Sequence, residues 1–129
     1  MVLDSTALVS AIERDRDHAR LLGAMEGASE LAIGTPTLVQ ASALLVHRLG
    51  LLGRSLLSRF REECGLVVIP FDERHWLAAA SASVRYGRGR HPAQLSADDC
   101  MTYATAHLAE APLLFVGNHF PLTDLPIAG

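Results

Sequence analysis

Short apolar runs alternate along this chain with longer segments in which apolar residues recur every three or four positions. The short runs, at 1–4, 31–33, 66–70 and 112–117, predict buried strands. The longer segments predict helices from Ser5 onward and over 18–25, 36–50, 51–63, 73–86 and 96–109, with Thr35 as the N-cap of the third. Strands that alternate with helices predict an α/β fold with a parallel, doubly wound sheet.

The composition is that of a globular protein. The chain has 129 residues, 50% of them hydrophobic and 19% charged, so we expect a single domain over 1–129. Its apolar stretches are too short for a membrane span, and its first residues lack the basic region of a secretory signal. Cys64 and Cys100 have neither metal-type spacing nor a disulfide framework, so the default expectation is a cytoplasmic location.

The charged residues narrow the function classes. A formal net charge of −3 argues against indiscriminate coating of nucleic acid, although a local basic patch is compatible with it. All 11 basic residues are arginine. This excludes Schiff-base catalysis and the phosphate-binding P-loop, because both need a lysine.

Polar residues directly follow two of the predicted strands. Asp4 follows the first strand, and the hydroxyls of Ser5 and Thr6 come next. Asn118 and His119 follow the last strand. In doubly wound sheets, ligands bind beyond the carboxyl ends of the strands, where the strand order reverses. These side chains are therefore candidates for a crevice, while an aspartate such as Asp4 is also a common helix N-cap.

Gln40 is one of the few polar residues in a helical segment that is otherwise largely apolar. It shares a face with His47, which follows seven positions later. Because a buried amide without a partner destabilises a fold by about 1–3 kcal/mol, we expect Gln40 to have one. A backbone group in the core and a polar site are both open as its partner.

The segment LSADDC places Ser96 before a helix, with Asp98 and Asp99 in the first turn. Serine followed three positions later by an acidic residue resembles a capping box, and carboxylates are stabilised at this end of a helix. One aspartate is enough for capping. Two in succession at the edge of the crevice hint at magnesium, which prefers oxygen ligands and retains most of its water.

The loop RYGRGRH, residues 85–91, carries three arginines, a tyrosine and a histidine among glycines. A flexible loop of this kind is able to bind phosphates through Arg88 and Arg90 while an aromatic ring stacks on a base. The alternative is a solvated surface loop without a binding role.

Four segments in order, MVLDSTALV, TPTLVQAS, YGRGRHPAQLSADDC and PLLFVGNHFPLTDL, resemble the PIN-domain family, and more narrowly the VapC-type toxins of bacterial toxin–antitoxin modules. The resemblance implies a three-layer sandwich, with a central parallel sheet wrapped by helices, and a metal-dependent endoribonuclease. It also implies a homodimer that is silenced by a VapB-like antitoxin. The apolar residues suited to hosting a partner, unless they are plain core, are Leu8, Val9, Leu21, Leu22 and Met25.

The acidic cluster of this family maps only in part onto the chain. Asp4 matches the first acidic position, Thr6 the hydroxyl that accompanies it, and Asp99 the third acidic position. Gln40 stands where the family has a glutamate, and His119 where it has an aspartate. The resemblance therefore assigns Asp4 and Asp99 as catalytic and metal-binding residues, with Gln40 and His119 as altered ligands.

Two further carboxylates bear on the charge of this site. Asp98 replaces what is commonly a glycine, and we count it among the catalytic residues because it restores one negative charge. Asp124 keeps the late Thr-Asp of the family. Fewer carboxylates weaken the binding of divalent cations. We expect Mg²⁺ as the cofactor, while the imidazole of His119 suits Mn²⁺ or Zn²⁺ better.

Three functions are consistent with these residues. In the first, a metal-dependent RNase, Asp4 and Asp99 hold one cation and Asp98 or His119 positions the water. The residues that would bind its RNA substrate are Thr6, Arg88, Arg90 and His91. The second function is that of an impaired PIN domain that binds an antitoxin or RNA without cleavage. The third is that of a non-catalytic α/β binding domain.

Overall fold

The computed structural model describes residues 1–128 and confirms the α/β prediction. Four parallel strands form one sheet in the order β3-β2-β1-β4. The strands are β1 (Val2–Leu3), β2 (Ala32–Gly34), β3 (Val67–Ile69) and β4 (Leu113–Leu114). The helices are α1 (Ser5–Glu13), α2 (His18–Glu26), α3 (Thr35–Leu49), α4 (Leu51–Cys64), α5 (Glu73–Tyr86) and α6 (Ala97–Ala109), followed by the 3-10 helix η1 (Phe120–Leu122).

β1 lies inside the sheet, where Val2 pairs in parallel register with Ala32 of β2 and with Leu113 of β4. The strand order reverses around β1, because the chain moves outward through β2 and β3 and then returns to β4 on the other side. The carboxyl end of β1 is therefore the switch point at which such sheets form their ligand crevices. Asp4 follows β1 directly.

The last strand is shorter than the predicted run of 112–117. β4 pairs with β1 through Leu113 and Leu114 only. Two residues later, the backbone amide of Val116 donates to the hydroxyl of Thr6 at 2.9 Å instead of to a neighbouring strand. The chain therefore leaves the sheet after Leu114, and Val116 contacts Thr6 in the segment that follows β1.

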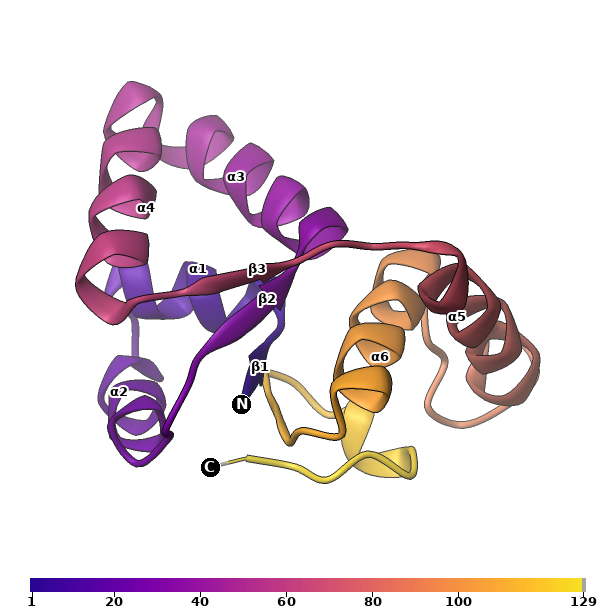
Figure 1. The fold of residues 1–129 in the computed structure, drawn as a ribbon. Helices are drawn as coiled ribbons and strands as arrows, with labels where there is room; N and C mark the ends of the chain where they lie inside the picture. Colours follow the sequence, from indigo (N-terminus) through magenta and orange to yellow (C-terminus); the bar gives the residue numbers. More distant parts are fainter. Residues whose placement is uncertain (129) are drawn as a thin grey trace.

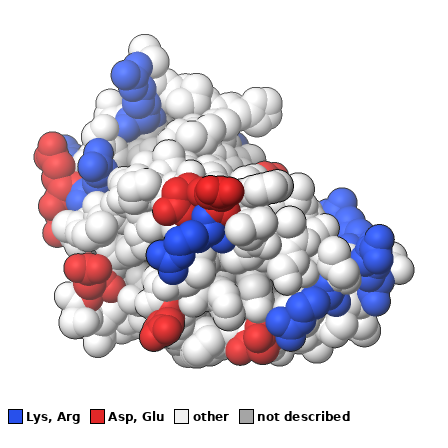
Figure 2. Space-filling model, turned by 45° about the vertical axis from the view of Figure 1, so that its right-hand side comes forward, with Lys and Arg blue, Asp and Glu red and all other residues white. Residues whose placement is uncertain are grey.

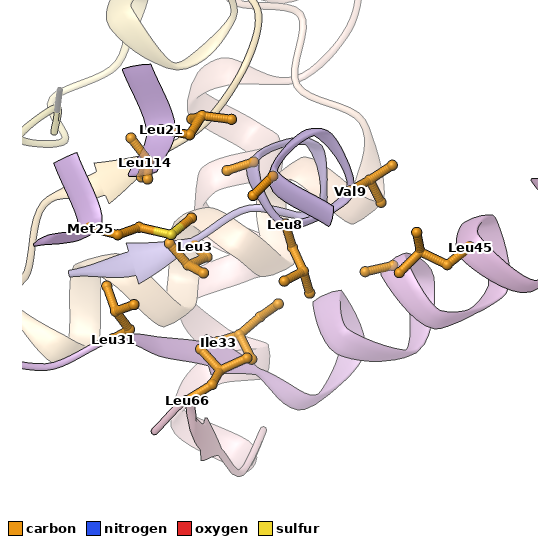
Figure 3. Packing of buried hydrophobic residues seen from close by; sticks show 13 residues of the cluster. Leu3, Leu8, Val9, Leu21, Met25, Leu31, Ile33, Leu45, Leu66 and Leu114 are labelled. Atoms are coloured by element: carbon orange, nitrogen blue, oxygen red, sulfur yellow. The ribbon is translucent and has the colours of Figure 1, made fainter. Parts of the chain in front are cut away.

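Helices cover both faces of the sheet and complete three layers (Figure 1). α1, α2 and α4 lie on one face, and α5 and α6 lie on the other. Successive strand residues point to opposite faces of the sheet. Leu3 and Leu114 therefore enter the core under α1–α4, which Figure 3 shows. Val2 and Leu113 enter the core under α5 and α6. Of the helices in residues 1–128, none is long and apolar enough to cross a membrane.

The start of α3 lies close to α6. Gly34 is the N-cap of α3, so the prediction that Thr35 caps this helix is wrong. The Thr35 hydroxyl donates instead to the carbonyl of Ile69 at the end of β3, at 2.9 Å. A Cβ at Gly34 would lie 2.5 Å from the hydroxyl oxygen of Thr105 in α6. Glycine therefore permits the close approach of α3 and α6, the two helices that carry most of the candidate site.

Candidate active site

Asp4 stands between β1 and α1, and only 4% of its surface is exposed. Its Oδ2 accepts hydrogen bonds from the Thr6 hydroxyl at 2.7 Å and from the Thr6 amide at 3.3 Å. Its Oδ1 accepts from the Thr102 hydroxyl of α6 at 2.9 Å. Asp4 is also the N-cap of α1, so the capping role and the position in the crevice coexist in one residue.

Within residues 1–128, no arginine or histidine forms an ion pair with Asp4. Burial raises the pKa of Asp4 above its ordinary value of 3.8, while hydrogen bonds from Thr6 and Thr102 lower it. The negative charge of Asp99 raises this pKa further, so the two carboxylates lie within electrostatic reach of each other. A cation between them would offset their repulsion.

Asp99 lies in the first turn of α6, three residues before Thr102 and therefore on the same side of the helix. It forms the predicted capping box with Ser96. The Asp99 amide donates to the Ser96 hydroxyl at 3.1 Å, and Asp99 Oδ2 accepts from the Ser96 amide at 3.0 Å. The cap uses one carboxylate oxygen of Asp99 and leaves the other for further ligands.

Gln40 connects α3 to the start of α6. Its Nε2 donates to Asp98 Oδ2 at 3.3 Å, so its partner is a carboxylate and not a backbone group of the core. Gln40 is half-buried, and His47, on the same predicted face, is exposed. The amide of Gln40 donates to Asp98 at a place where the carboxylate of a glutamate would repel it.

His119 is bound to the loop before α6. Its Nδ1 lies 2.7 Å from the carbonyl oxygen of Ala93, so Nδ1 carries a proton and donates it. In the neutral ring, Nε2 then carries the lone pair, which is the form that binds metals. The structure does not bring His119 into a ligand cluster: within residues 1–128, no three His, Cys, Asp or Glu side chains lie close enough together to hold an ion.

Residues 86–95, which contain most of the arginine loop, form successive turns between α5 and α6. A parallel backbone bridge closes this segment at its base. Inside it, His91 Nδ1 accepts from the Ala93 amide at 3.0 Å. Arg88 and Arg90 are exposed on this turn. The bond from His119 to Ala93 ties the same turn to the segment after β4.

Asp124 has a separate environment, with partners from α5 and α6. It accepts a hydrogen bond from the Tyr103 hydroxyl at 2.6 Å, and Arg85 lies 3.8 Å from its second oxygen. The hydrogen bond from Tyr103 and the charge of Arg85 lower the pKa of Asp124. Asp124 therefore anchors the C-terminal segment and does not join the pair formed by Asp4 and Asp99.

The donor set fits a hydrated divalent cation and not a closed cage. Asp4 and Asp99 offer two carboxylates within electrostatic reach of each other. Asp98 stands in the same first turn of α6, but within residues 1–128 it does not complete a group of three carboxylates around one ion. Mg²⁺ is commonly bound by one or two carboxylates together with water and substrate phosphates, and Mn²⁺ accepts the same oxygen ligands.

Sequence reasoning missed two buried threonines at this site. Thr37 of α3 and Thr102 of α6 are 2% and 1% exposed, and their hydroxyl oxygens lie 3.0 Å apart. The signal for Thr102 is its spacing from Asp99, because residues three apart on a helix share a side. Nothing local marks Thr37, since its partner belongs to another helix.

Comparisons with known proteins establish the family. Residues 1–124 match the family model described as the PIN domain. The chain belongs to the PIN-domain family. It is 43% identical over 130 residues to ribonuclease VapC36 of Mycobacterium tuberculosis, with 100% of this chain and 94% of that protein covered. This relative places it in the VapC group of PIN domains.

Solved structures share the PIN-domain fold at low sequence identity. VapC20 of Mycobacterium tuberculosis, described as a toxin that cleaves the sarcin–ricin loop, has a TM-score of 0.78 at 13% identity, over 96% of this chain and 95% of that chain. VapBC2 of Rickettsia felis, described as bound to a DNA fragment from its promoter, has a TM-score of 0.75 at 17% identity, over 98% and 95%. At these identities the likeness concerns the fold alone.

Proposed function

We propose that this PIN-domain protein is a divalent-metal-dependent endoribonuclease that acts as the toxin of a VapBC-like pair. The observation that carries the proposal is the environment of Asp4, a buried carboxylate with neutral hydrogen-bond donors and with Asp99 in electrostatic reach. A fold with an uncompensated buried charge gains stability when a cation binds it. The name of VapC36 as a ribonuclease supports RNA as the substrate.

Asp4 and Asp99 would hold the cation, Mg²⁺ or Mn²⁺. When bound, such an ion polarises a phosphate and makes its water a stronger nucleophile. Asp98, whose carboxylate accepts from Gln40, adds negative charge beside this pair. His119 donates its Nδ1 proton to Ala93, and its Nε2 is thereby left to accept a hydrogen bond from water.

Arg88 and Arg90 would bind the phosphate backbone of RNA. Both are exposed on the turn that leads into α6, the helix whose first turn is acidic. Figure 2 shows basic and acidic side chains interspersed on one face of the molecule, without a continuous basic surface. A few local arginines would therefore guide the RNA. Thr6 beside Asp4 and His91 within the turn complete the proposed RNA-binding set.

The antitoxin would bind an apolar surface between α2 and α4. Leu22 of α2 is half-buried and, together with Cys64 of α4, lines two neighbouring hollows of about 550 and 230 Å³. The solved toxin–antitoxin pair of Rickettsia felis supports an antitoxin partner. Met25 is buried but also lines the larger hollow. The other apolar residues expected to host a partner are buried core instead: Leu8, Val9 and Leu21.

A homodimer would cover the outer face of α5. Trp76, Leu77 and Val84 are 59%, 55% and 64% exposed, and Trp76 and Val84 lie two turns apart on this helix. Large exposed apolar side chains on one face are typical of an interface. We retain the cytoplasm as the proposed location, in which Cys64 and Cys100 stay the free thiols that the structure contains.

The second candidate is a PIN domain that binds an antitoxin or RNA without cleaving it. The amide of Gln40 in place of a carboxylate favours this function, as does the use of Asp99 in a helix cap. Cleavage of a structured RNA, first with Mg²⁺ and then with Mn²⁺, distinguishes the two. We expect cleavage that Asp4→Asn abolishes. Absence of cleavage with either ion, together with no metal binding by calorimetry, would assign the binding role.

A further inference from the structure

Three buried side chains from distant segments form one hydrogen-bonded chain at the candidate site. The Thr37 hydroxyl of α3 lies 3.0 Å from the Thr102 hydroxyl of α6, and the Thr102 hydroxyl lies 2.9 Å from Asp4 Oδ1. Their exposed fractions are 2%, 1% and 4%, so bulk water does not compete for these bonds. The three partners come together only when α3 and α6 have packed.

The single proton of each hydroxyl fixes the direction of this chain. An ionised carboxylate only accepts hydrogen bonds, so Thr102 donates its proton to Asp4. Thr102 then has no proton left for Thr37, and the Thr37 hydroxyl donates to Thr102. Both protons therefore point toward Asp4.

The carboxylate of Asp4 is held at both oxygens. Thr6 donates to Oδ2, and Thr102 donates to Oδ1. Thr6 is itself fixed, because its hydroxyl oxygen accepts from the Val116 amide. Rotation of the carboxylate would lengthen the hydrogen bonds at both oxygens. Oδ1 keeps one lone pair beyond the bond from Thr102, and that bond sets where the lone pair points.

We propose that Thr102, oriented by Thr37, is a positioning residue that directs the free lone pair of Asp4 Oδ1 toward the cation shared with Asp99. The inference rests on the proposed metal-dependent function. Asp99 lies one helical turn before Thr102, so one side of α6 presents both the second carboxylate and the hydroxyl that orients the first. A shift of α6 would move both together.

The matched variants Thr102→Val and Thr102→Ser test this role. Valine keeps the branched shape without the hydroxyl, and serine keeps the hydroxyl. In calorimetric titration of the whole chain with Mn²⁺, without RNA, we expect Thr102→Val to weaken binding about tenfold or more, as loss of a residue that orients a metal ligand does. We expect the Mn²⁺ affinity of Thr102→Ser to stay within about threefold of wild type. Thr37→Val leaves the hydrogen bond from Thr102 to Asp4 in place, so its affinity should lie between those of Thr102→Val and Thr102→Ser.

Equal Mn²⁺ affinity in wild type and Thr102→Val would overturn the proposal, and so would an equal loss in Thr102→Ser. Thermal unfolding in EDTA checks that each variant folds. If Thr102→Val does not fold, Thr37→Val against Thr37→Ser carries the same comparison. If the wild type binds no Mn²⁺, the proposed function fails. A crystal structure of the valine variant that folds then decides the positioning role: a rotated Asp4 carboxylate supports it, and an unchanged one overturns it.

Discussion

Two carboxylates of this PIN domain accept hydrogen bonds from consecutive residues of α6 and yet have opposite electrostatic environments. Thr102 donates to Asp4, and Tyr103 donates to Asp124. Burial raises the pKa of Asp4, and the groups that lower it are neutral hydroxyls and an amide. The pKa of Asp124 is lowered by the Tyr103 hydroxyl and by Arg85, 3.8 Å away.

The difference distinguishes a structural carboxylate from one that is available to an ion. The charge of Asp124 is compensated within the fold by Arg85, so this residue ties the C-terminal segment to α5 and α6. The charge of Asp4 is not compensated in this way, and Asp99 adds to it. A buried negative charge with only neutral partners is costly to keep, which is typical of functional sites.

The largest effect is expected when each carboxylate is neutralised and RNA cleavage is measured. Asp4→Asn should lower the single-turnover rate at saturating Mn²⁺ about a hundredfold or more, because it removes a metal ligand and not merely a residue that orients one. Asp124→Asn, the matched control, should stay within about threefold of wild type. Similar losses in the two variants would remove the distinction between them.

Gln40→Glu adds a carboxylate where Gln40 now donates to Asp98 at 3.3 Å. We expect Mg²⁺ binding to tighten by roughly tenfold, because the number of charged ligands sets affinity. The melting temperature in EDTA should fall, because two carboxylates then face each other. The neutral control, Gln40→Met, should lower the melting temperature without tightening Mg²⁺ binding.

Adding His119→Asp to Gln40→Glu tests the ligand assignment further. The double variant should bind Mg²⁺ more tightly than Gln40→Glu does, because a carboxylate replaces an imidazole that Mg²⁺ accepts poorly. Calorimetry provides the comparison. An affinity for Mg²⁺ equal to that of wild type in both variants would show that neither position faces the cation.

Stability without metal should change in opposite directions for the two aspartates. Asp4→Asn should raise the free energy of unfolding by about 1 kcal/mol, because it removes a buried charge that lacks a cationic partner. Asp124→Asn should lower it by about 0.5–1 kcal/mol, a figure reduced for solvent screening. Urea denaturation in EDTA measures both. If both variants were less stable than wild type, the charge of Asp4 would be stabilised by the fold, as that of Asp124 is, and the contrast would fail.

The pH dependence of these stability differences should also be opposite, although smaller. Because the folded pKa of Asp4 lies above 3.8, its ionisation destabilises the fold progressively as pH rises above that value. The stability advantage of Asp4→Asn over wild type should therefore grow as pH rises from about 4 toward neutrality. Because the folded pKa of Asp124 is lowered, its contribution is present above 3.8 and disappears as pH falls through the folded value. Urea denaturation across this range provides the test.

The local pattern of apolar and polar residues predicts which helices and strands form better than it predicts the residues at which they end. The bounds of α5 agree with the predicted 73–86, because Asp72 caps one end and Gly87 follows the other. β4 is shorter than its apolar run, because its end is set by a hydrogen bond between Val116 and Thr6, 110 residues apart in the chain. Such an interaction has no signature in the sequence around the strand.

At the candidate site too, sequence prediction succeeds for local features and fails for contacts between distant segments. The capping roles and the strand-end position of Asp4 follow from nearby residues. The contacts that assemble the site join segments 26 to 98 residues apart, and the packing of α3 against α6, which Gly34 permits, sets several of them. They are the pairs Gln40–Asp98, His119–Ala93, Thr37–Thr102 and Thr102–Asp4.

The most direct measurement is anomalous diffraction at the manganese edge from crystals grown with Mn²⁺. We predict a peak about 2.1 Å from a carboxylate oxygen of Asp4, with Asp99 as the second ligand or bound through water. No such peak should lie at Asp124, whose charge Arg85 already compensates. A fully occupied Mn²⁺ elsewhere, with none at Asp4, would contradict the account.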